Sequence, residues 1–353
     1  MPDPQELLDT AVHDFQQANS TVGIAAVLWY EDTAYYTNFG RNRKEGPAVS
    51  NQSVFQMQSV QKVFTGLLFA SQVVQKRMQL KCVPFMKYIT GNVPRGPQWI
   101  YQVQPWELAT HTANFPYNID GNPAQNLYKG QGPPAGLTSW WSNFAPTNNT
   151  ILGCSWAYSD LGVLSLGYAT AAAAGQTYPE LLRSFIKEPW EMVNTWLNMD
   201  DVPVDLKVGG YGTGTTWMLG VKSCAVDMLS FVKHHLKLIQ MKSEHEAAVD
   251  LVLKPLFCPD GQPTMGICWQ ISEQPKYRLY AKDGGGSGFS TWVGLIPEAK
   301  CGVVFLANSQ SKKGSNWLRY GKALFSELLG TSIGEGAEAL CEPSDLLEEE
   351  PQT

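Results

Sequence analysis

Four short apolar segments near the C-terminus constrain the fold of this chain more than any other feature. They read TMGICWQIS, KYRLYAKDG, FSTWVGLIP and CGVVFLANS, and they are separated by glycine, proline or charged residues. Short runs rich in β-branched and aromatic residues, divided by turn residues, are typical of an antiparallel meander. Near the N-terminus, VGIAAVLWY and TAYYTNFG predict a β-hairpin joined by the turn EDT.

Helical patterns occupy much of the chain between these strands, and residues 82–150 form a long segment rich in proline, glycine, asparagine and tryptophan. A long segment without a regular pattern is typical of a functional loop region. We therefore predict an α+β fold in which an antiparallel sheet, built from both ends of the chain and flanked by helices, carries an inserted helical lobe. The expected sheet lobe comprises residues 1–64 and 206–340, the helical lobe 65–205, and 341–353 a loose acidic tail.

Composition excludes several classes of function. Of the 353 residues 44% are hydrophobic and 16% charged, and the net charge of -6 leaves no basic stripe for a nucleic acid. The longest apolar stretch, VLSLGYATAAAAG, is too short to span a membrane. The N-terminus lacks the cationic start and apolar core of a secretory signal, and the seven cysteines are scattered. These features predict a cytoplasmic protein with free thiols.

One apolar segment, FQMQSVQKVFTGLLFA, contains Ser59 and Lys62 three positions apart. On a helix this spacing puts both side chains on one face. A lysine ammonium buried there is costly unless it is paired or loses its proton. The same spacing occurs at Ser184 with Lys187, on an amphipathic surface helix, and at Ser309 with Lys312, in a polar loop. Only the first pair lies in an apolar setting.

A serine hydroxyl becomes a nucleophile when a nearby group removes its proton, so we asked what could assist Ser59. Histidine is not favoured, because four of the five histidines lie on predicted helices among charges, where we expect them at the solvated surface: His13, His234, His235 and His245. No G-x-S-x-G elbow is present. The cysteines form no C-x-x-C pair and no cluster has metal-ligand spacing, so we expect neither a metal nor another cofactor.

Two further patterns follow along the chain: Tyr158-Ser159-Asp160 before an apolar helix, and Lys282-Asp283-Gly284 at the start of a glycine run. A phosphate-binding loop is the rival interpretation of the glycine run, but the required Gly-Lys-Ser/Thr ending is missing. Ser-x-x-Lys, Tyr-x-Asp and Lys-x-Gly in this order match the penicillin-recognising serine enzymes. ELATHTA, GVKSCAVDMLSFVK and GFSTWVGLIPEAKCGVVFLAN also resemble family segments.

The chain thus resembles the class C β-lactamase-related serine hydrolases of the β-lactamase and penicillin-binding-protein superfamily over nearly all of residues 20–330. The resemblance implies an antiparallel sheet flanked by helices, an all-helical lobe and a cleft between them. It also implies that Ser59 is the acylated nucleophile, with Lys62 keeping it activated, Tyr158 shuttling protons and Lys282 lining the cleft. Which of Lys62 and Tyr158 is the base stays open. The oxyanion hole would use the backbone N–H groups of Ser59 and Gly285.

The glycine run lets a substrate approach the bare backbone of Gly284 and Gly286 closely. The resemblance also implies that the Asn118 side-chain amide binds the substrate. Two residues depart from the family pattern: Asp160 stands where asparagine is usual, and Asp283 where threonine is usual. An ionised aspartate only accepts hydrogen bonds, and it repels a substrate carboxylate if it faces the substrate, although strand alternation can also turn Asp283 away. Penicillins and cephalosporins carry such a carboxylate. We therefore expect them to be poor substrates, and a neutral or amine-bearing ester or amide to be preferred.

Three functions fit this pattern. The first is hydrolysis of a small-molecule ester or amide through an acyl-Ser59 intermediate. The second is an acyltransferase that passes the same acyl group to an alcohol or amine, with the aromatic-rich segment from Trp99 to Trp156 acting as a lid against water. In a structural interpretation those aromatics are ordinary core. The third function, suggested by the two aspartate replacements, is an inactive protein that only binds ligand.

Overall fold

The computed structural model describes residues 2–89, 100–120, 124–144, 151–211, 220–258, 263–310 and 316–333. The chain divides into two compact units. The first unit comprises Met1–Gln61, Met192–Leu238 and Ser272–Thr353, and the second comprises Lys62–Glu191 and Ile239–Ile271. The expected helical lobe 65–205 overlaps the second unit, which also contains residues 239–271. The predicted acidic tail 341–353 lies outside the described residues.

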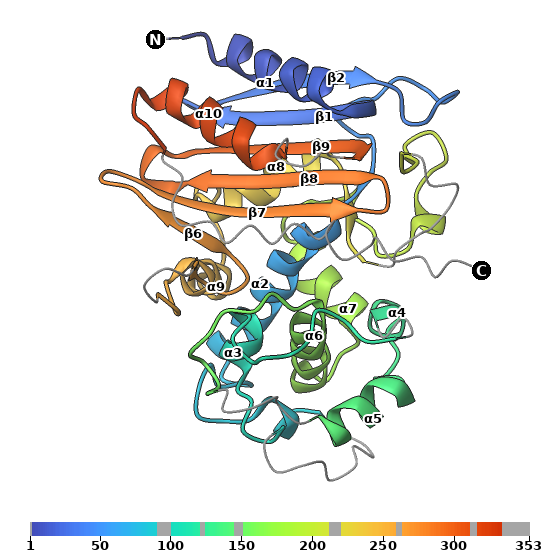
Figure 1. The fold of residues 1–353 in the computed structure, drawn as a ribbon, viewed down its shortest axis with the longest axis vertical. Helices are drawn as coiled ribbons and strands as arrows, with labels where there is room; N and C mark the ends of the chain where they lie inside the picture. The colour runs from blue at the N-terminus through green and yellow to red at the C-terminus, as the bar shows by residue number, and fades with distance from the viewer. Residues whose placement is uncertain are drawn as a thin grey trace, which may run out of the picture. The chain divides into compact units, whose positions relative to one another are not determined.

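An antiparallel sheet forms the centre of the first unit (Figure 1). Its long strands pair in the order β2-β1-β9-β8-β7, with bounds Thr33–Gly40 for β2, Ser20–Tyr30 for β1, Cys301–Gln310 for β9, Phe289–Ile296 for β8 and Arg278–Gly286 for β7. The strands β7, β8 and β9 follow one another as a meander, and β1 pairs with β9, so both ends of the chain contribute to one sheet. The predicted α+β fold is confirmed.

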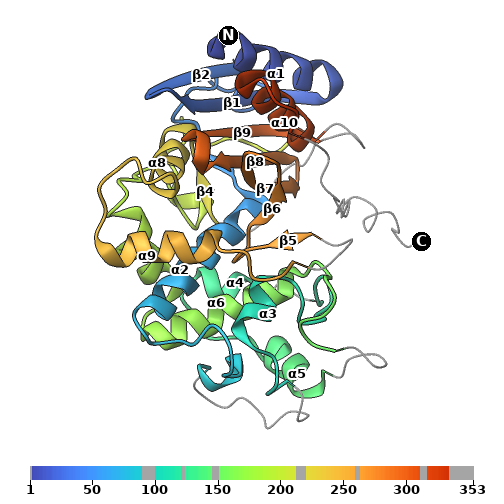
Figure 2. The same cartoon turned by 90° about the vertical axis from the view of Figure 1, so that its left-hand side faces the viewer.

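Helices cover both faces of this sheet. On one face, α1 (Pro4–Ala18) and α10 (Trp317–Leu329) pack against each other and on the sheet, and α8 (Ala225–His235) packs against β1 and β9 on the other face (Figures 1 and 2). Because β1 is covered on both faces, its residues from Gly23 to Trp29 are all buried, and they read as a continuous apolar run rather than an alternating one.

Short elements complete the first unit. They are the two-residue strands β3 (Phe55–Gln56) and β4 (Lys222–Ser223), which pair with each other, and the 3-10 turns η1 (Gln58–Val60), η4 (Met199–Asp201) and η5 (Pro297–Ala299). The turn η1 packs against β7 and β8. Ser59 lies in this turn, which leads directly into the helix Gln61–Val74.

The second unit is mainly helical. Its helix α6 (Asp160–Ala174) is in contact with α3 (Pro105–Ala109), α4 (Ala124–Tyr128) and α7 (Tyr178–Leu182), which lie around it in Figure 1. Every residue of α6 from Leu161 to Ala171 is buried, as expected for a helix that is apolar all round. The remaining elements are α2 (Gln61–Val74), η2 (Phe85–Lys87), α5 (Ala135–Asn143), the π-helical turn η3 (Arg183–Lys187), α9 (Ser243–Leu253) and β5 (Thr264–Met265). The strand β5 pairs with β6 (Gln270–Glu273), whose last two residues belong to the first unit.

Residues 82–150 are less irregular than their composition suggested. Four helical elements lie in the described part of this segment: η2, α3, α4 and α5. Both α3 and α4 have five residues, which is too short to show a helical period in the sequence. Several aromatic side chains of this segment pack into the unit: Trp141 is fully buried, and Phe85 contacts both Phe115 and Trp141. For these three residues the packing fits the interpretation that the aromatics are part of the hydrophobic core.

The prediction for the histidines was wrong at three positions. His234, His235 and His245 are buried, and only His13 of the four is exposed. The His235 Nδ1 atom lies 2.9 Å from the Phe231 carbonyl, and His245 Nε2 lies 2.9 Å from the Phe185 carbonyl. Polar partners of this kind let a histidine be buried on a helix that also carries charges. Charged neighbours in the sequence therefore did not indicate whether these histidines are exposed or buried.

Within the described part of the chain, no helix combines the length and the apolar character needed to cross a membrane. Six cysteines fall in the described residues, and all of them are free thiols.

Candidate active site

Ser59 lies on η1 and is partly exposed. Two hydrogen bonds hold the residue before this turn in place: the Met57 N–H donates to the Val221 carbonyl over 3.0 Å, and the Thr291 hydroxyl donates to the Met57 carbonyl over 2.9 Å. Thr291 belongs to β8. The first unit therefore fixes the serine next to the sheet, on the side where η1 meets β7 and β8.

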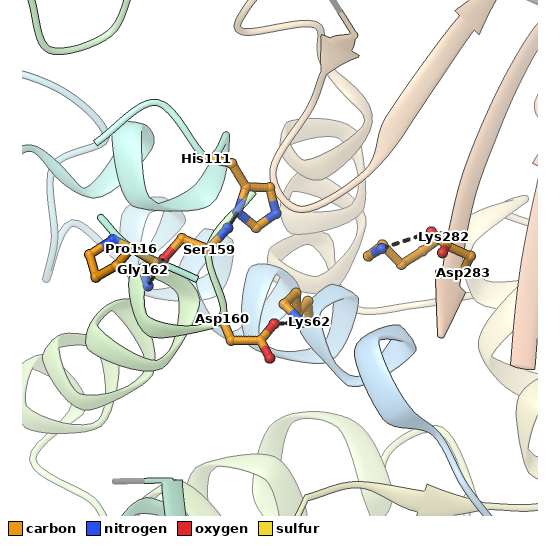
Figure 3. A network of polar contacts seen from close by, with 8 residues as sticks. All are labelled: Lys62, His111, Pro116, Ser159, Asp160, Gly162, Lys282 and Asp283. Atoms are coloured by element: carbon orange, nitrogen blue, oxygen red, sulfur yellow. Dashed lines mark hydrogen bonds and ion pairs between the residues drawn. The ribbon is translucent and has the colours of Figure 1, made fainter. Parts of the chain in front are cut away.

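Lys282 and Asp283 are neighbours on β7, and their side chains form an ion pair (Figure 3). The Lys282 Nζ atom lies 3.0 Å from Asp283 Oδ1, while the lysine side chain is 3% exposed and the aspartate side chain 44% exposed. Adjacent residues of a strand point to opposite faces, but here the carboxylate turns back to the ammonium. Asp283 is thus directed to Lys282 rather than away from it.

Glycine is required at position 284 because η1 comes so close to β7. A Cβ atom built there would lie 2.5 Å from Thr291 Oγ1 and 2.7 Å from the Met57 carbonyl oxygen. A Cβ atom on the next residue, Gly285, would meet nothing within 4 Å. The close approach therefore depends on Gly284, whereas the space beside Gly285 is open.

In the second unit, Lys62 has a carboxylate partner (Figure 3). Its Nζ atom lies 2.6 Å from Asp160 Oδ1, and its side chain is 5% exposed. The sequence predicted that a buried lysine here must be paired or lose its proton, and the structure shows the pair. Asp160 is the first residue of α6, where the partial positive charge of the helix N-terminus also favours a carboxylate.

The phenol ring of Tyr158 lies beside the same lysine. Lys62 Nζ is 4.9 Å from the centroid of the ring, within the range of a cation–π contact. Aromatic rings surround Tyr158 on other sides, with centroid distances of 4.5 Å to His111, 6.0 Å to Tyr117 and 6.2 Å to Trp156. The second unit thus brings three predicted site residues together: Lys62, Tyr158 and Asp160.

Ser159 links this group to the loop that carries His111 (Figure 3). Its backbone N–H donates to His111 Nδ1 over 3.2 Å, and its hydroxyl donates to the Pro116 carbonyl over 2.7 Å. The same hydroxyl accepts from the Gly162 N–H over 2.9 Å and so caps the N-terminus of α6. One serine therefore fixes the start of α6 and the position of the loop.

His111 and Tyr117 were not predicted as site residues. His111 is buried and contacts the Tyr158 ring. Burial, and then the charge of Asp160, raise the pKa of Tyr117 well above its ordinary value, so this phenol stays protonated at neutral pH. The only sequence signal for His111 was its place in ELATHTA, a segment that resembles the family; nothing in the sequence singled out Tyr117.

Asn118 is exposed, and its side-chain oxygen accepts a hydrogen bond from the N–H of Ile119 over 2.9 Å. Its role in substrate binding stays a prediction, as do the roles of Gly284 and Gly286. The described residues contain no group of three or more histidine, cysteine, aspartate or glutamate side chains arranged to hold a metal ion.

Sequence comparisons with known proteins point to one family. A sequence profile of the Beta-lactamase family matches residues 8–323. A β-lactamase of Pseudomonas fluorescens is 20% identical over 87% of this chain and 94% of its own length. A β-lactamase of Escherichia coli K12 is 23% identical over 81% of this chain and 84% of its own length.

A solved structure shares the fold. The crystal structure of a β-lactamase/D-alanine carboxypeptidase from Pseudomonas syringae superposes with a TM-score of 0.78. It is 19% identical in sequence, and the match covers 92% of this chain and 98% of that one. Since the family profile spans most of the sequence, the chain belongs to the Beta-lactamase family.

Proposed function

We propose that this protein is a serine hydrolase that cleaves an ester or amide through a covalent acyl-Ser59 intermediate. The observation that carries the proposal is the setting of Lys62. This lysine follows a partly exposed serine by three positions, is buried, is paired with Asp160 and lies beside the Tyr158 phenol. A phenol accepts a proton only in its phenolate form, and a nearby ammonium group favours that form.

In the proposed reaction the Ser59 hydroxyl attacks the substrate carbonyl, and its proton passes to the group formed by Lys62 and Tyr158. The backbone N–H groups of Ser59 and Gly285 stabilise the oxyanion of the tetrahedral intermediate. The leaving alcohol or amine then takes up the proton, and the carbonyl re-forms as the acyl-Ser59 ester. Water attacks this ester in the second half of the reaction, which releases the acid and restores the serine.

The proposed role of Lys282 depends on its ion pair with Asp283. Lys282 on β7 supplies a cation, but Asp283 neutralises part of its charge at 3.0 Å. A cation that already has a carboxylate partner is a weaker anchor for a substrate carboxylate. This pair supports the proposal that the protein is not an efficient β-lactamase.

A fluorophosphonate probe and intact-mass measurement test the proposal. We expect one adduct on the parent protein and none on Ser59→Ala. Ser184→Ala is the matched control, because Ser184 and Lys187 have the same spacing on an unrelated helical turn, and it must label like the parent. A parent protein that takes up no probe would refute the proposal and support the ligand-binding alternative.

Acyl transfer is separated from hydrolysis by the products. We expect a chromogenic ester to yield the free acid at the same rate as the chromophore, even with an added alcohol or amine. If most acyl groups appeared on the acceptor, the acyltransferase alternative would replace the hydrolase.

A further inference from the structure

Each of the two lysines assigned to the site has its own carboxylate, and in each pair the carboxylate is the more exposed partner. The Lys62 side chain is 5% exposed and that of Asp160 29%, with 2.6 Å between Nζ and Oδ1. The Lys282 side chain is 3% exposed and that of Asp283 44%, with 3.0 Å between Nζ and Oδ1. A molecule that approaches either pair therefore meets carboxylate oxygens before it meets an ammonium group.

From this arrangement we propose that the substrate is an ester or amide whose acyl group bears a protonated amine, such as an aminoacyl ester or aminoacyl amide. This inference rests on the proposed function and adds the class of substrate. A substrate ammonium group gains from a partly exposed carboxylate. A substrate carboxylate is repelled by the same protein carboxylate, and both lysines that could attract it already have a carboxylate partner.

The substrate amine is recognised without loss of the internal pairs. An ionised carboxylate has two oxygens that together accept several hydrogen bonds, so it can hold the lysine and bind a ligand ammonium group at the same time. In both pairs the lysine Nζ atom contacts the Oδ1 atom of the carboxylate. Asp160 and Asp283 thus act as residues that determine specificity.

Three p-nitrophenyl esters of nearly equal size test the inference: the β-alanyl, butanoyl and succinyl esters, which end in an ammonium group, a methyl group and a carboxylate. We expect kcat/KM to fall in that order, with about a fivefold step between neighbours, as exposed charge interactions of ~1 kcal/mol give. Sodium chloride at high concentration should shrink both steps, because the carboxylates are partly exposed.

Variants identify the residues responsible. Asp160→Asn and Asp283→Asn should each bring the three rates closer together, whatever they do to the absolute rate. The matched control is Glu273→Gln, because Glu273 is 48% exposed and pairs with Arg278 over 2.8 Å, and it must keep the order of the parent. Equal rates for the three esters, or a preference that neither aspartate variant reduces, would overturn the inference.

Failure of this inference differs from failure of the proposed function. If the fluorophosphonate labels Ser59 and the butanoyl ester is cleaved but the amine gives no advantage, only the substrate class is wrong. If no probe binds and no ester is cleaved, the proposed function itself is wrong.

Discussion

Lys62 and Asp160 form an ion pair of 2.6 Å between residues that are almost a hundred positions apart in the sequence. The lysine comes from the first turns of α2 and the aspartate from the first residue of α6. Because the lysine is buried, removing either partner leaves the other charge without compensation, which destabilises the second unit.

The coupling between these two residues can be measured with a double-mutant cycle. We expect Lys62→Met and Asp160→Asn to show a coupling energy on the order of 1–3 kcal/mol in urea unfolding, because each single change leaves a partner with less compensation. The exposed pair of Arg183 and Glu188, 3.7 Å apart in the same unit, is the control. Its coupling should be below about 0.5 kcal/mol. Equal coupling energies for the two pairs would contradict the expectation that the buried pair of Lys62 and Asp160 interacts more strongly than the exposed pair.

His111 is expected to stabilise the loop that lies beside Tyr158. In His111→Phe the ring contact with Tyr158 can persist, but the Ser159 N–H loses its acceptor, which costs on the order of 1–3 kcal/mol in a buried setting. Thermal and urea unfolding measure this loss. His13→Phe serves as the control, since His13 is exposed, and its stability should not change. A His111 variant as stable as the parent would show that the hydrogen bond is not needed.

Gly284 and Gly285 should respond differently to alanine. Gly284→Ala places a methyl group against Thr291 and the Met57 carbonyl, so we expect a loss of about 1–3 kcal/mol or a displaced η1. Gly285→Ala has open space and should change the stability by less than about 1 kcal/mol. The stability loss of each variant is measured from its urea unfolding midpoint relative to that of the parent. Similar losses for both variants would argue against the close approach of η1 to β7.

Glu107 should make the stability depend on pH. Burial raises the pKa of this carboxyl from 4.5 to about 7, and the hydrogen bond from the Gln104 N–H over 2.7 Å only partly opposes this. In the unfolded chain the group ionises near its ordinary pKa, so between 4.5 and about 7 the folded state binds more protons. Stability from this group is therefore present at low pH and is lost as the pH rises through that window.

Glu107→Gln keeps an acceptor for the Gln104 N–H and removes the titration. Comparing the free energy of unfolding at pH 5 and pH 8, we expect the parent to lose on the order of 1–2 kcal/mol more than the variant. A parent and a variant with the same pH dependence would show that Glu107 titrates normally.

Much of the fold followed from local patterns in the sequence. The strands β7, β8 and β9, the N-terminal hairpin and the helix α6 were predicted, because apolar periodicity and turn residues act over a few positions. Helices of five residues were missed since they are shorter than the window in which a period shows. The order of three short motifs was also readable from the sequence, and it indicated the family.

The tertiary structure alone decided which side chains meet and which are buried. It paired Lys62 with Asp160, placed His111 against Tyr158, turned Asp283 toward Lys282 and buried His234, His235 and His245. The sequence determines where strands and helices form because their backbone hydrogen bonds and periodicity are local. Burial and pairing depend on segments that are distant in the chain, and only their packing fixes the surroundings of a charge.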